Sequence, residues 1–379
     1  CLVVAPSLCY SGLRMAVPRR ARRVSCAPLV LVLLLATTRA GWSEESTGGQ
    51  IENDASASNL DGFKIVGYLP EYRFDGVDWN GTCAGVTHLL LFSLEPTVDG
   101  ALGALDRFPD TDTMRVAKSS CGQYGTKLMV SVGGAGRSRF FPTVTQNKQT
   151  RRKFASNLVA FCAKHGLQGV DVNWEYPQDE AEWVSLAKLL RATRIALSKS
   201  PIANPELFMA YHPESEGVMK KTGIPEHVIL MHAMAYDNVR DTGGHSTLKY
   251  AKQVLTNAKA HFGELRKISL GVPFYGRGDG VLKPVGDAKT YAEINQESPI
   301  AHEDLDHHAG YLFNGVKTMR SKTAAAIEAG AGGVTVWEVG QDVNFRKKTS
   351  LLRAVATATW PEGRPKGGHM VEQDLRSEL

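Results

Sequence analysis

The chain has 379 residues, of which 43% are hydrophobic and 22% charged, so it can bury a large core and is neither fibrous nor of low complexity. Its net charge of +5 originates in the first 40 residues, which hold six arginines and no acidic residue; the remainder has 38 basic and 39 acidic residues, a balance of −1. Such a neutral body gives no electrostatic reason to expect nucleic acid or an anionic membrane as a partner.

Residues 1–40 have the layout of a secretory signal peptide. Met15 is a candidate start; a basic stretch follows it, then an apolar run from Ala27 to Ala36, and Thr38-Arg39-Ala40 offers a cleavage site. The apolar run has about half of the ~20 residues that a membrane-spanning helix needs, which favours cleavage over a transmembrane anchor. We therefore expect a secreted protein without membrane contact after cleavage, with the endoplasmic reticulum and the lysosome as alternative locations.

Residues 41–60 are polar and typical of a flexible lead-in. From residue 61 to 361, short apolar runs alternate with longer helix-like stretches. Continuous apolar runs are typical of strands that are buried on both faces. The eight runs are Ile65–Leu69, His88–Ser93, Leu128–Val132, Gly169–Asn173, Leu207–Tyr211, Ile229–Ala235, Ile268–Val272 and Val334–Trp337.

The stretches between these runs predict helices, among them Lys148–His165, Glu180–Ser198 and Thr247–His261. Eight β/α repeats with right-handed crossovers close into a barrel, so we predict one α/β domain, a (β/α)8 TIM barrel, over residues 61–361. A doubly wound open sheet is the alternative, but no G-x-G-x-x-G follows the first strand, so a dinucleotide site has no support.

Residues 362–379 are polar and predict a disordered tail. The final Arg-Ser-Glu-Leu loosely resembles an endoplasmic-reticulum retrieval signal, and an arbitrary tail is the preferred interpretation. Of the cysteines beyond the leader, Cys83 and Cys121 each lie shortly before a predicted strand, so their helices could be neighbours and bridged; Cys162 is the third. Pairing cannot be read from sequence alone.

The ends of the predicted strands carry the chemistry, because catalytic groups of TIM barrels lie at the carboxyl ends of strands. On the fourth strand Asp171, Asn173 and Glu175 are spaced by two and point to the same side. Three polar groups inside a barrel are costly unless they bond one another and serve a purpose. A carboxylic acid at that strand end has a raised pKa, which suits it to donate a proton to a leaving oxygen. A structural polar cluster that closes the barrel is the alternative.

This strand resembles the D-G-x-D-x-D-x-E motif of glycoside hydrolase family 18, the chitinases. The resemblance extends from Lys64 to Asp342, and five matches in order at strand ends are highly specific. Beside the fourth strand, the matches are Ser131-Val132-Gly133-Gly134 on the third, Met234-Ala235-Tyr236-Asp237 on the sixth, Pro273-Phe274-Tyr275-Gly276-Arg277 on the seventh, and Trp337 on the eighth.

The resemblance implies a chitinase-type hydrolase that cleaves β-1,4-N-acetylglucosamine linkages of chitin or chito-oligosaccharides. Its mechanism would be retaining and substrate-assisted, with no metal or cofactor and, we expect, in a monomer. Glu175 would protonate the glycosidic oxygen and later activate water, Tyr236 would donate to the acetamido carbonyl, and Trp337 would lie under the sugar ring. The implied catalytic residues are Glu175, Asn173, Asp171 and Tyr236, and the implied substrate-binding residues are Tyr68, Gly134, Tyr176, Met234, Asp237 and Trp337.

The sequence departs from the family pattern at two positions. The first motif Asp is Gln168, at the inner start of the strand, where the change affects core polarity only. The residue two before the acid, usually Asp, is Asn173; it can accept a hydrogen bond from the acetamido N–H but supplies no negative charge. We therefore expect an active enzyme with lowered turnover and an altered acid limb of its pH profile.

Two alternative functions remain. A chitin-binding lectin is favoured by Asn173 and opposed by the presence of Glu175, and an endo-β-N-acetylglucosaminidase is opposed by the M-A-Y-D match. Only 60 positions separate Arg277 from Trp337, so we expect no full α+β insertion domain and a shallow groove. The His- and Asp-rich segment at residues 302–308 has no metal-ligand spacing and is interpreted as a solvated loop.

Overall fold

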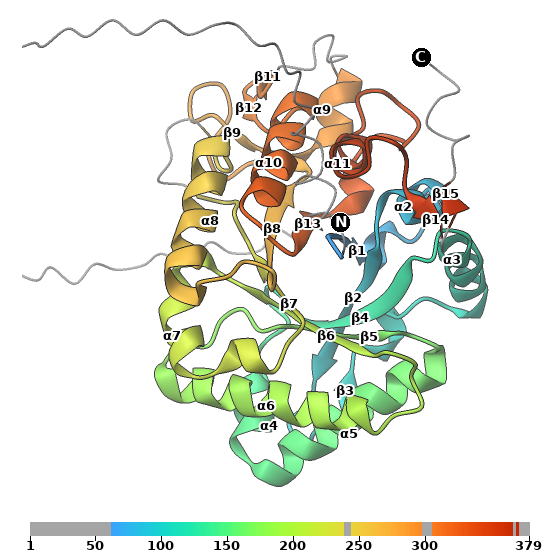
Figure 1. Ribbon diagram of the computed structural model, residues 1–379, viewed down its shortest axis with the longest axis vertical. Coiled ribbons are helices and arrows are strands. Elements are labelled where there is room, and N and C mark those ends of the chain that lie inside the picture. The colour runs from blue at the N-terminus through green and yellow to red at the C-terminus, as the bar shows by residue number, and fades with distance from the viewer. Residues whose placement is uncertain (1–61, 239–243, 298–304, 367–368, 371–379) are drawn as a thin grey trace, which may run out of the picture. The chain divides into compact units, whose positions relative to one another are not determined.

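The computed structural model describes residues 62–238, 244–297, 305–366 and 369–370. In these residues, eight parallel strands pair in the order β1-β2-β4-β5-β6-β7-β8-β13, and β13 pairs with β1 to close the ring. Figure 1 shows the helices outside this ring of strands. The predicted (β/α)8 barrel is confirmed. The predicted leader, the lead-in and residues 371–379 of the tail lie outside the described residues.

Each of the eight predicted apolar runs is a strand of the barrel. Their side chains are almost all buried, as expected for strands covered by helices on one face and by the barrel interior on the other. The strands are β1 (Lys64–Pro70), β2 (His88–Pro96), β4 (Lys127–Gly133), β5 (Gly169–Asn173), β6 (Glu206–Tyr211), β7 (Leu230–Ala233), β8 (Ile268–Pro273) and β13 (Gly333–Trp337).

The helices begin and end at residues whose chemistry suits those positions. Helix α6 begins where the Asp179 carboxylate accepts a hydrogen bond from the Glu182 N–H, and α5 ends at Gly166, which has a left-handed backbone (φ 63°). No described helix is both long and apolar enough to cross a bilayer. The helices are α2 (Trp79–Gly85), α3 (Thr111–Gln123), α4 (Phe141–Gln146), α5 (Lys148–His165), α6 (Glu180–Ser198), α7 (Glu216–Lys221), α8 (Leu248–Phe262), α9 (Tyr291–Glu297), α10 (Val316–Glu328) and α11 (Leu351–Thr359).

The apolar core has two parts. The larger lies between the strands and the surrounding helices, and a smaller cluster fills the barrel interior. The interior cluster is rich in aromatic rings at the carboxyl end, where Tyr68, Phe92 and Trp337 contact one another with ring centroids 4.9–5.9 Å apart. Buried polar side chains, among them Ser131, Asp171 and His232, share this interior.

Between β8 and α10 the chain forms a small antiparallel sheet that the sequence analysis did not predict. The strands β9 (Tyr275–Gly278), β10 (Ala288–Thr290), β11 (His307–His308) and β12 (Tyr311–Leu312) pair in the order β10-β9-β12-β11. The strands are two to four residues long, too short for an alternating pattern to be recognised. This sheet matters for function because β9 carries Tyr275 and Arg277 at the edge of the barrel.

Two further contacts hold α2 and the segment that follows α11. Cys83 of α2 and Cys121 of α3 form a disulfide, which settles the pairing that the sequence left open; Cys162 is buried and free. Short strands β3 (Leu102–Gly103), β14 (Pro365–Lys366) and β15 (His369–Met370) lie beside the barrel elements. Arg364, within the predicted tail, donates hydrogen bonds to the carbonyl oxygens of Cys83 (2.7 Å) and Val86 (2.6 Å).

Candidate active site

The carboxyl ends of the barrel strands surround a cavity of about 590 Å³. Ligand and active sites of TIM barrels lie at this end of the barrel. Most of the residues that the sequence predicted line it: Tyr68, Asn173, Glu175, Tyr176, Met234, Tyr236, Asp237 and Trp337. The sequence-predicted residues Asp171 and Gly134 are not among its lining residues.

Glu175 follows the end of β5 and faces the cavity. Its backbone N–H donates to Ser138 Oγ (3.0 Å), which fixes the residue at the strand end. Burial raises the pKa of the Glu175 carboxyl, against the lowering effect of hydrogen bonds with Asn173 and Tyr176. A carboxyl group that keeps its proton at mildly acidic pH can protonate a leaving oxygen.

Asp171 lies below the cavity, inside the barrel, and is fully buried. Its Oδ2 accepts hydrogen bonds from Tyr68 Oη (2.9 Å) and Ser131 Oγ (2.8 Å). Ser131 is the partner of Asp171 in the register of β4 and β5, so the pairing of strands brings the two side chains together. Burial raises the pKa of Asp171 to about 6, although these two hydrogen bonds lower it. Asp171 is therefore bonded to Tyr68 and Ser131 inside the barrel and does not line the cavity.

Asn173 lies between these two carboxyl groups on the same strand and is 2% exposed. No described group donates to its side-chain oxygen. A buried amide oxygen without a donor costs free energy in the empty protein, and a ligand N–H in the cavity can remove that cost.

Gly134 supports the floor of the cavity through its backbone. It has φ 105°, and a Cβ atom there would lie 2.2 Å from the Phe92 ring, so only glycine fits. Its N–H donates to the carbonyl oxygen of Asn173 (2.6 Å). Gly134 thus allows Phe92 to pack closely against its backbone, and the neighbouring Ala135 lines the cavity.

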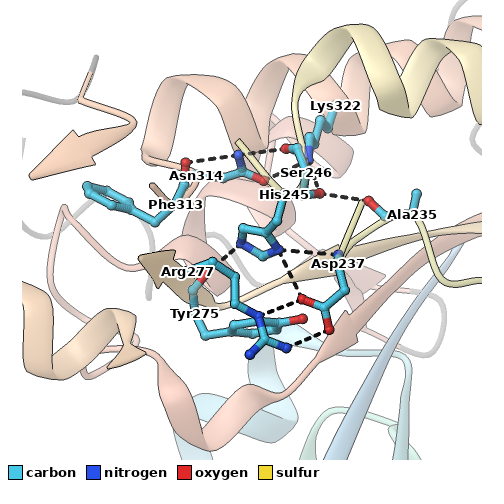
Figure 2. Close-up of polar contacts among 9 residues, drawn as sticks. All are labelled: Ala235, Asp237, His245, Ser246, Tyr275, Arg277, Phe313, Asn314 and Lys322. Atoms are coloured by element: carbon cyan, nitrogen blue, oxygen red, sulfur yellow. Dashed lines mark hydrogen bonds and ion pairs between the residues drawn. The ribbon is translucent and has the colours of Figure 1, made fainter. Parts of the chain in front are cut away.

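The cavity rim holds a network of charged side chains (Figure 2). Arg277 of β9 contacts Asp237 with both ends of its guanidinium group: Nε to Oδ1 and Nη2 to Oδ2 are each 2.8 Å. His245 approaches from the other side, with Nδ1 3.4 Å from Asp237 Oδ1. Burial raises the pKa of Asp237, but hydrogen bonds from His245 and Arg277 outweigh it and hold the pKa well below its usual range.

Behind this rim, Lys322 of α10 is fully buried. Its ammonium group donates to Ser246 O (2.6 Å), Ser246 Oγ (2.7 Å) and Asn314 Oδ1 (2.6 Å), as Figure 2 shows. Ser246 Oγ in turn donates to Ala235 O (2.7 Å), two residues before Asp237. Burial lowers the pKa of Lys322 to about 7. The network anchors the segment that carries Asp237 to the outer helix.

Several residues of the site escaped the sequence analysis. Arg277 and Tyr275 lie within the seventh-strand motif, which by itself assigns them no role, and His232 of β7 lies inside an apolar run. The sequence does contain a pattern that indicates His232. His232, Met234 and Tyr236 are spaced by two, as are the polar residues of the fourth strand, so His232 points to the same side as two predicted site residues. The missed lining residues include Phe92, Arg137, His212, His232, Tyr275, Arg277 and Thr335.

The chain resembles known proteins over the barrel. The pattern described as "Glycosyl hydrolases family 18" matches residues 64–342. Chitinase 1 of Aphanocladium album is 26% identical over 244 residues, which are 52% of this chain and 57% of that protein. An endochitinase of Manduca sexta is 31% identical over 186 residues, 40% of this chain and 32% of that protein. The matched part thus spans from a third to just over half the length of these relatives.

Solved structures share the fold. The GH18 chitinase ChiB of Flavobacterium johnsoniae superimposes with a TM-score of 0.67 and 24% identity, covering 78% of this chain and 94% of that one. A class V chitinase of Nicotiana tobaccum gives a TM-score of 0.66 and 18% identity, covering 79% and 99%. The family match covers the barrel, and the five motifs lie at the strand ends that surround the cavity. The chain therefore belongs to glycosyl hydrolases family 18.

Proposed function

We propose that this protein hydrolyses β-1,4 linkages of N-acetylglucosamine polymers or oligomers with retention of configuration, using the substrate's own acetamido group as nucleophile. The observation that carries the proposal is Glu175, a carboxyl group with a raised pKa at the wall of a cavity lined by Asn173 and Tyr236. The relatives named above as chitinases support the same substrate class.

The reaction has two steps. In the first, the Glu175 carboxyl donates its proton to the glycosidic oxygen while the acetamido carbonyl oxygen of the sugar attacks C1, so that the C1–O bond to the leaving sugar breaks and an oxazolinium ion forms. In the second, the Glu175 carboxylate accepts a proton from water as that water attacks C1 and reopens the ring. Glu175 thereby regains its proton, and the two inversions at C1 retain its configuration.

The carboxylates around the cavity support attack by the substrate rather than by the enzyme. Glu175 and Asp237 are the two carboxylates among the described lining residues, and Asp237 is held by both ends of Arg277. A carboxylate in such a bidentate pair is a poor nucleophile because its charge is already stabilised. Asn173 Oδ1, which lacks a protein donor, suits the acetamido N–H, and Trp337 offers a ring face for the sugar.

We also propose that the protein is exported and acts on chitin or chito-oligosaccharides as a monomer. The leader pattern supports export, and so does the Cys83–Cys121 disulfide, since such bonds persist in oxidising compartments. Amino-terminal sequencing of the protein secreted by a eukaryotic host tests this: a mature end near residue 41 is expected, and retention of residues 15–40 contradicts it.

The activity is tested by release of a fluorophore from chitobiose and chitotriose glycosides. Glu175→Gln is expected to reduce kcat by about 10³-fold, because general acid catalysis contributes about 10²–10⁴-fold. Binding of chitotriose should persist, since the amide has the same shape. ¹H NMR should show the β-anomer as the first product.

Other outcomes identify the alternatives. Tight binding of chito-oligosaccharides without hydrolysis by the wild-type protein would indicate a lectin. Cleavage of a high-mannose glycoprotein without action on chitotriose would indicate an endo-β-N-acetylglucosaminidase. Equal activity of the wild-type protein and Glu175→Gln would remove Glu175 from the mechanism.

A further inference from the structure

Unsatisfied polar atoms gather inside the barrel directly below the cavity. Among the described residues, Asp171 Oδ1, Asn173 Oδ1 and His232 Nε2 are buried without a hydrogen-bond partner. Each such atom costs free energy, so their occurrence in one place calls for an explanation. Asn173 Oδ1 has one in the proposed function, because the substrate amide can donate to it. The proposed function does not explain the other two atoms, Asp171 Oδ1 and His232 Nε2.

These two side chains approach each other inside the barrel from β5 and β7, which lie on either side of β6. His232 Nε2 lies 3.6 Å from Asp171 Oδ1, and both side chains are at most 1% exposed. The distance is slightly longer than a hydrogen bond but brings a ring N–H into direct electrostatic contact with the carboxylate. Burial lowers the pKa of His232 to about 3, which keeps the imidazole neutral.

The other ring nitrogen of His232 contacts two hydroxyl groups. His232 Nδ1 lies 2.7 Å from Ser269 Oγ and 2.8 Å from Thr335 Oγ1, and the two hydroxyl oxygens are 2.7 Å apart. If Thr335 donates to Ser269 and Ser269 donates to Nδ1, every hydroxyl proton has an acceptor; if Nδ1–H donates instead, Ser269 Oγ can donate to Met231 O (3.5 Å), so the hydroxyl groups accept both tautomers and Asp171 selects between them. The ring proton then lies on Nε2 and points at Asp171. The opposite tautomer would set the Nε2 lone pair against the Asp171 carboxylate, which is repulsive.

We propose that His232 is a positioning residue of the hydrolytic site: its Nε2–H holds Asp171 in the ionised form, and Asp171 supplies from below the negative charge that Asn173 does not carry. The inference rests on the proposed function. The positive charge of the oxazolinium ion develops near Asn173. The Asp171 carboxylate, two residues earlier on β5, stabilises that charge through the dry, low-dielectric interior of the barrel.

Of the described groups around Asp171, His232 is the one that can donate to Asp171 Oδ1. Tyr68 of β1 and Ser131 of β4 both bond to Oδ2 of Asp171, so they leave Oδ1 free. Among the described residues, His232 is the one basic side chain within 4 Å of Asp171, and its neutral ring acts as an N–H donor. Glu175 and Tyr236 also influence the buried cluster, through Tyr68, and add negative potential only.

The charged groups on the other elements do not substitute for His232. Arg137 and Arg277 line the cavity but are paired with Glu71 and Asp237, respectively. His88 of β2 is the second buried imidazole near His232 and is itself bonded to Glu206.

The pH profile of kcat for chitotriose glycoside hydrolysis tests the proposal. His232→Leu removes the donor at similar volume, so the acid limb should move to higher pH by about one unit and kcat at pH 6 should fall by about tenfold. His232→Gln retains a side-chain N–H and should restore part of both changes. In the Asn173→Asp background, His232→Leu should lower kcat less, because the charge is then supplied beside the substrate.

The matched control is His88→Gln, which removes a second buried imidazole on a barrel strand and should leave the acid limb in place. Unfolding by urea distinguishes a purely structural role of His232 from the proposed one. A His232 variant that loses stability but keeps the wild-type pH profile contradicts the proposal. The proposal is also contradicted if the acid limbs of the wild-type protein and His232→Leu coincide.

A measurement without substrate gives an independent answer. In protein labelled with ¹³C and ¹⁵N in histidine, the ring shifts of His232, assigned by comparison with His232→Gln, should report the neutral Nε2–H tautomer from pH 5 to pH 8. A protonated ring or the Nδ1–H tautomer in that range overturns the proposal. If the wild-type protein shows no Glu175-dependent hydrolysis, the proposed function fails, whereas the tautomer result stands by itself.

Discussion

Two polar networks border the cavity, and they are built in opposite ways. The floor, which consists of Asp171, His232, Tyr68, Ser131, Ser269 and Thr335, comes from strands and is fully buried. The rim network comes mostly from segments beyond the strand ends. It consists of Asp237, Arg277 and His245 at the rim, of which Asp237 and Arg277 are partly exposed, and of Ser246, Asn314 and Lys322 behind the rim. At the floor, desolvation dominates the protonation of Asp171, while at the rim close ion pairs overcome it at Asp237.

Because of this difference, the two networks can affect different properties of the enzyme. A buried carboxyl with a pKa of about 6 changes its charge in the working range of a hydrolase, so the floor can shape the pH profile. The Asp237 carboxylate stays ionised far below that range, so the rim provides fixed charges that orient a sugar. The following substitutions separate the two networks.

The largest effect is expected at the floor, for Asp171→Asn. The rate should fall by about 10²-fold, because one charge that stabilises the cation is lost. Stability should change in the opposite direction. Burial raises the pKa of Asp171 to about 6 in the folded protein, so folding favours the protonated carboxyl. The contribution of Asp171 to stability is therefore fully present below the ordinary carboxyl pKa and is lost as the pH rises through 6. Above pH 6 the variant should therefore be more stable, by about 1–3 kcal/mol, in urea unfolding. A less stable variant with an unchanged rate would show that Asp171 is only structural.

The next effect is a gain, for Asn173→Asp. Charge-assisted hydrogen bonds are about twice as strong as neutral ones, so kcat on a chitin oligomer should rise by about tenfold. The new charge should also raise the pKa of Glu175 and move the basic limb of the profile to higher pH. No increase in kcat would contradict the role given to residue 173.

A smaller effect is expected at the rim, for Asp237→Asn and Arg277→Met. Both variants break the bidentate pair, and KM should rise by about fivefold to tenfold while kcat changes less. Stability should change by less than about 1 kcal/mol, since the pair is partly exposed. The acid limb should stay in place. If it moved as far as in His232→Leu, the division between floor and rim would be wrong.

The smallest effect on activity is expected for Lys322→Met, behind the rim, where kcat should remain within about twofold. Its signature is the pH dependence of stability. The folded-state pKa of Lys322, about 7, lies below the ordinary value of 10.5, so the unfolded chain binds more protons between these two values. Unfolding free energy of the wild-type protein should therefore increase relative to Lys322→Met from pH 7 to pH 10. A constant difference would indicate that the amine does not titrate in this window.

The sequence alone predicted the barrel and much of the site, for a physical reason. Strands covered on both faces are continuous apolar runs, and side chains spaced by two share a face, so the eight strands and the inward direction of Asp171, Asn173 and Glu175 were readable. The short strands β9 to β12 were not readable, because strands of two to four residues have no period. The family resemblance implied Gly134 as a substrate-binding residue, and that role stays a prediction; the conformation of Gly134 also allows the close packing of Phe92.

The tertiary structure decided which of the polar residues meet. His232 and Asp171 lie on strands that are not neighbours, so no local spacing brings them together; closure of the barrel does. The same holds for Arg277 and Asp237, which meet because β9 folds over the strand end. The pKa values of these groups depend on burial and on partners distant in the chain. Residue types and periods are local properties that the chain carries by itself, whereas desolvation and charge pairing exist only once the ring of strands has closed.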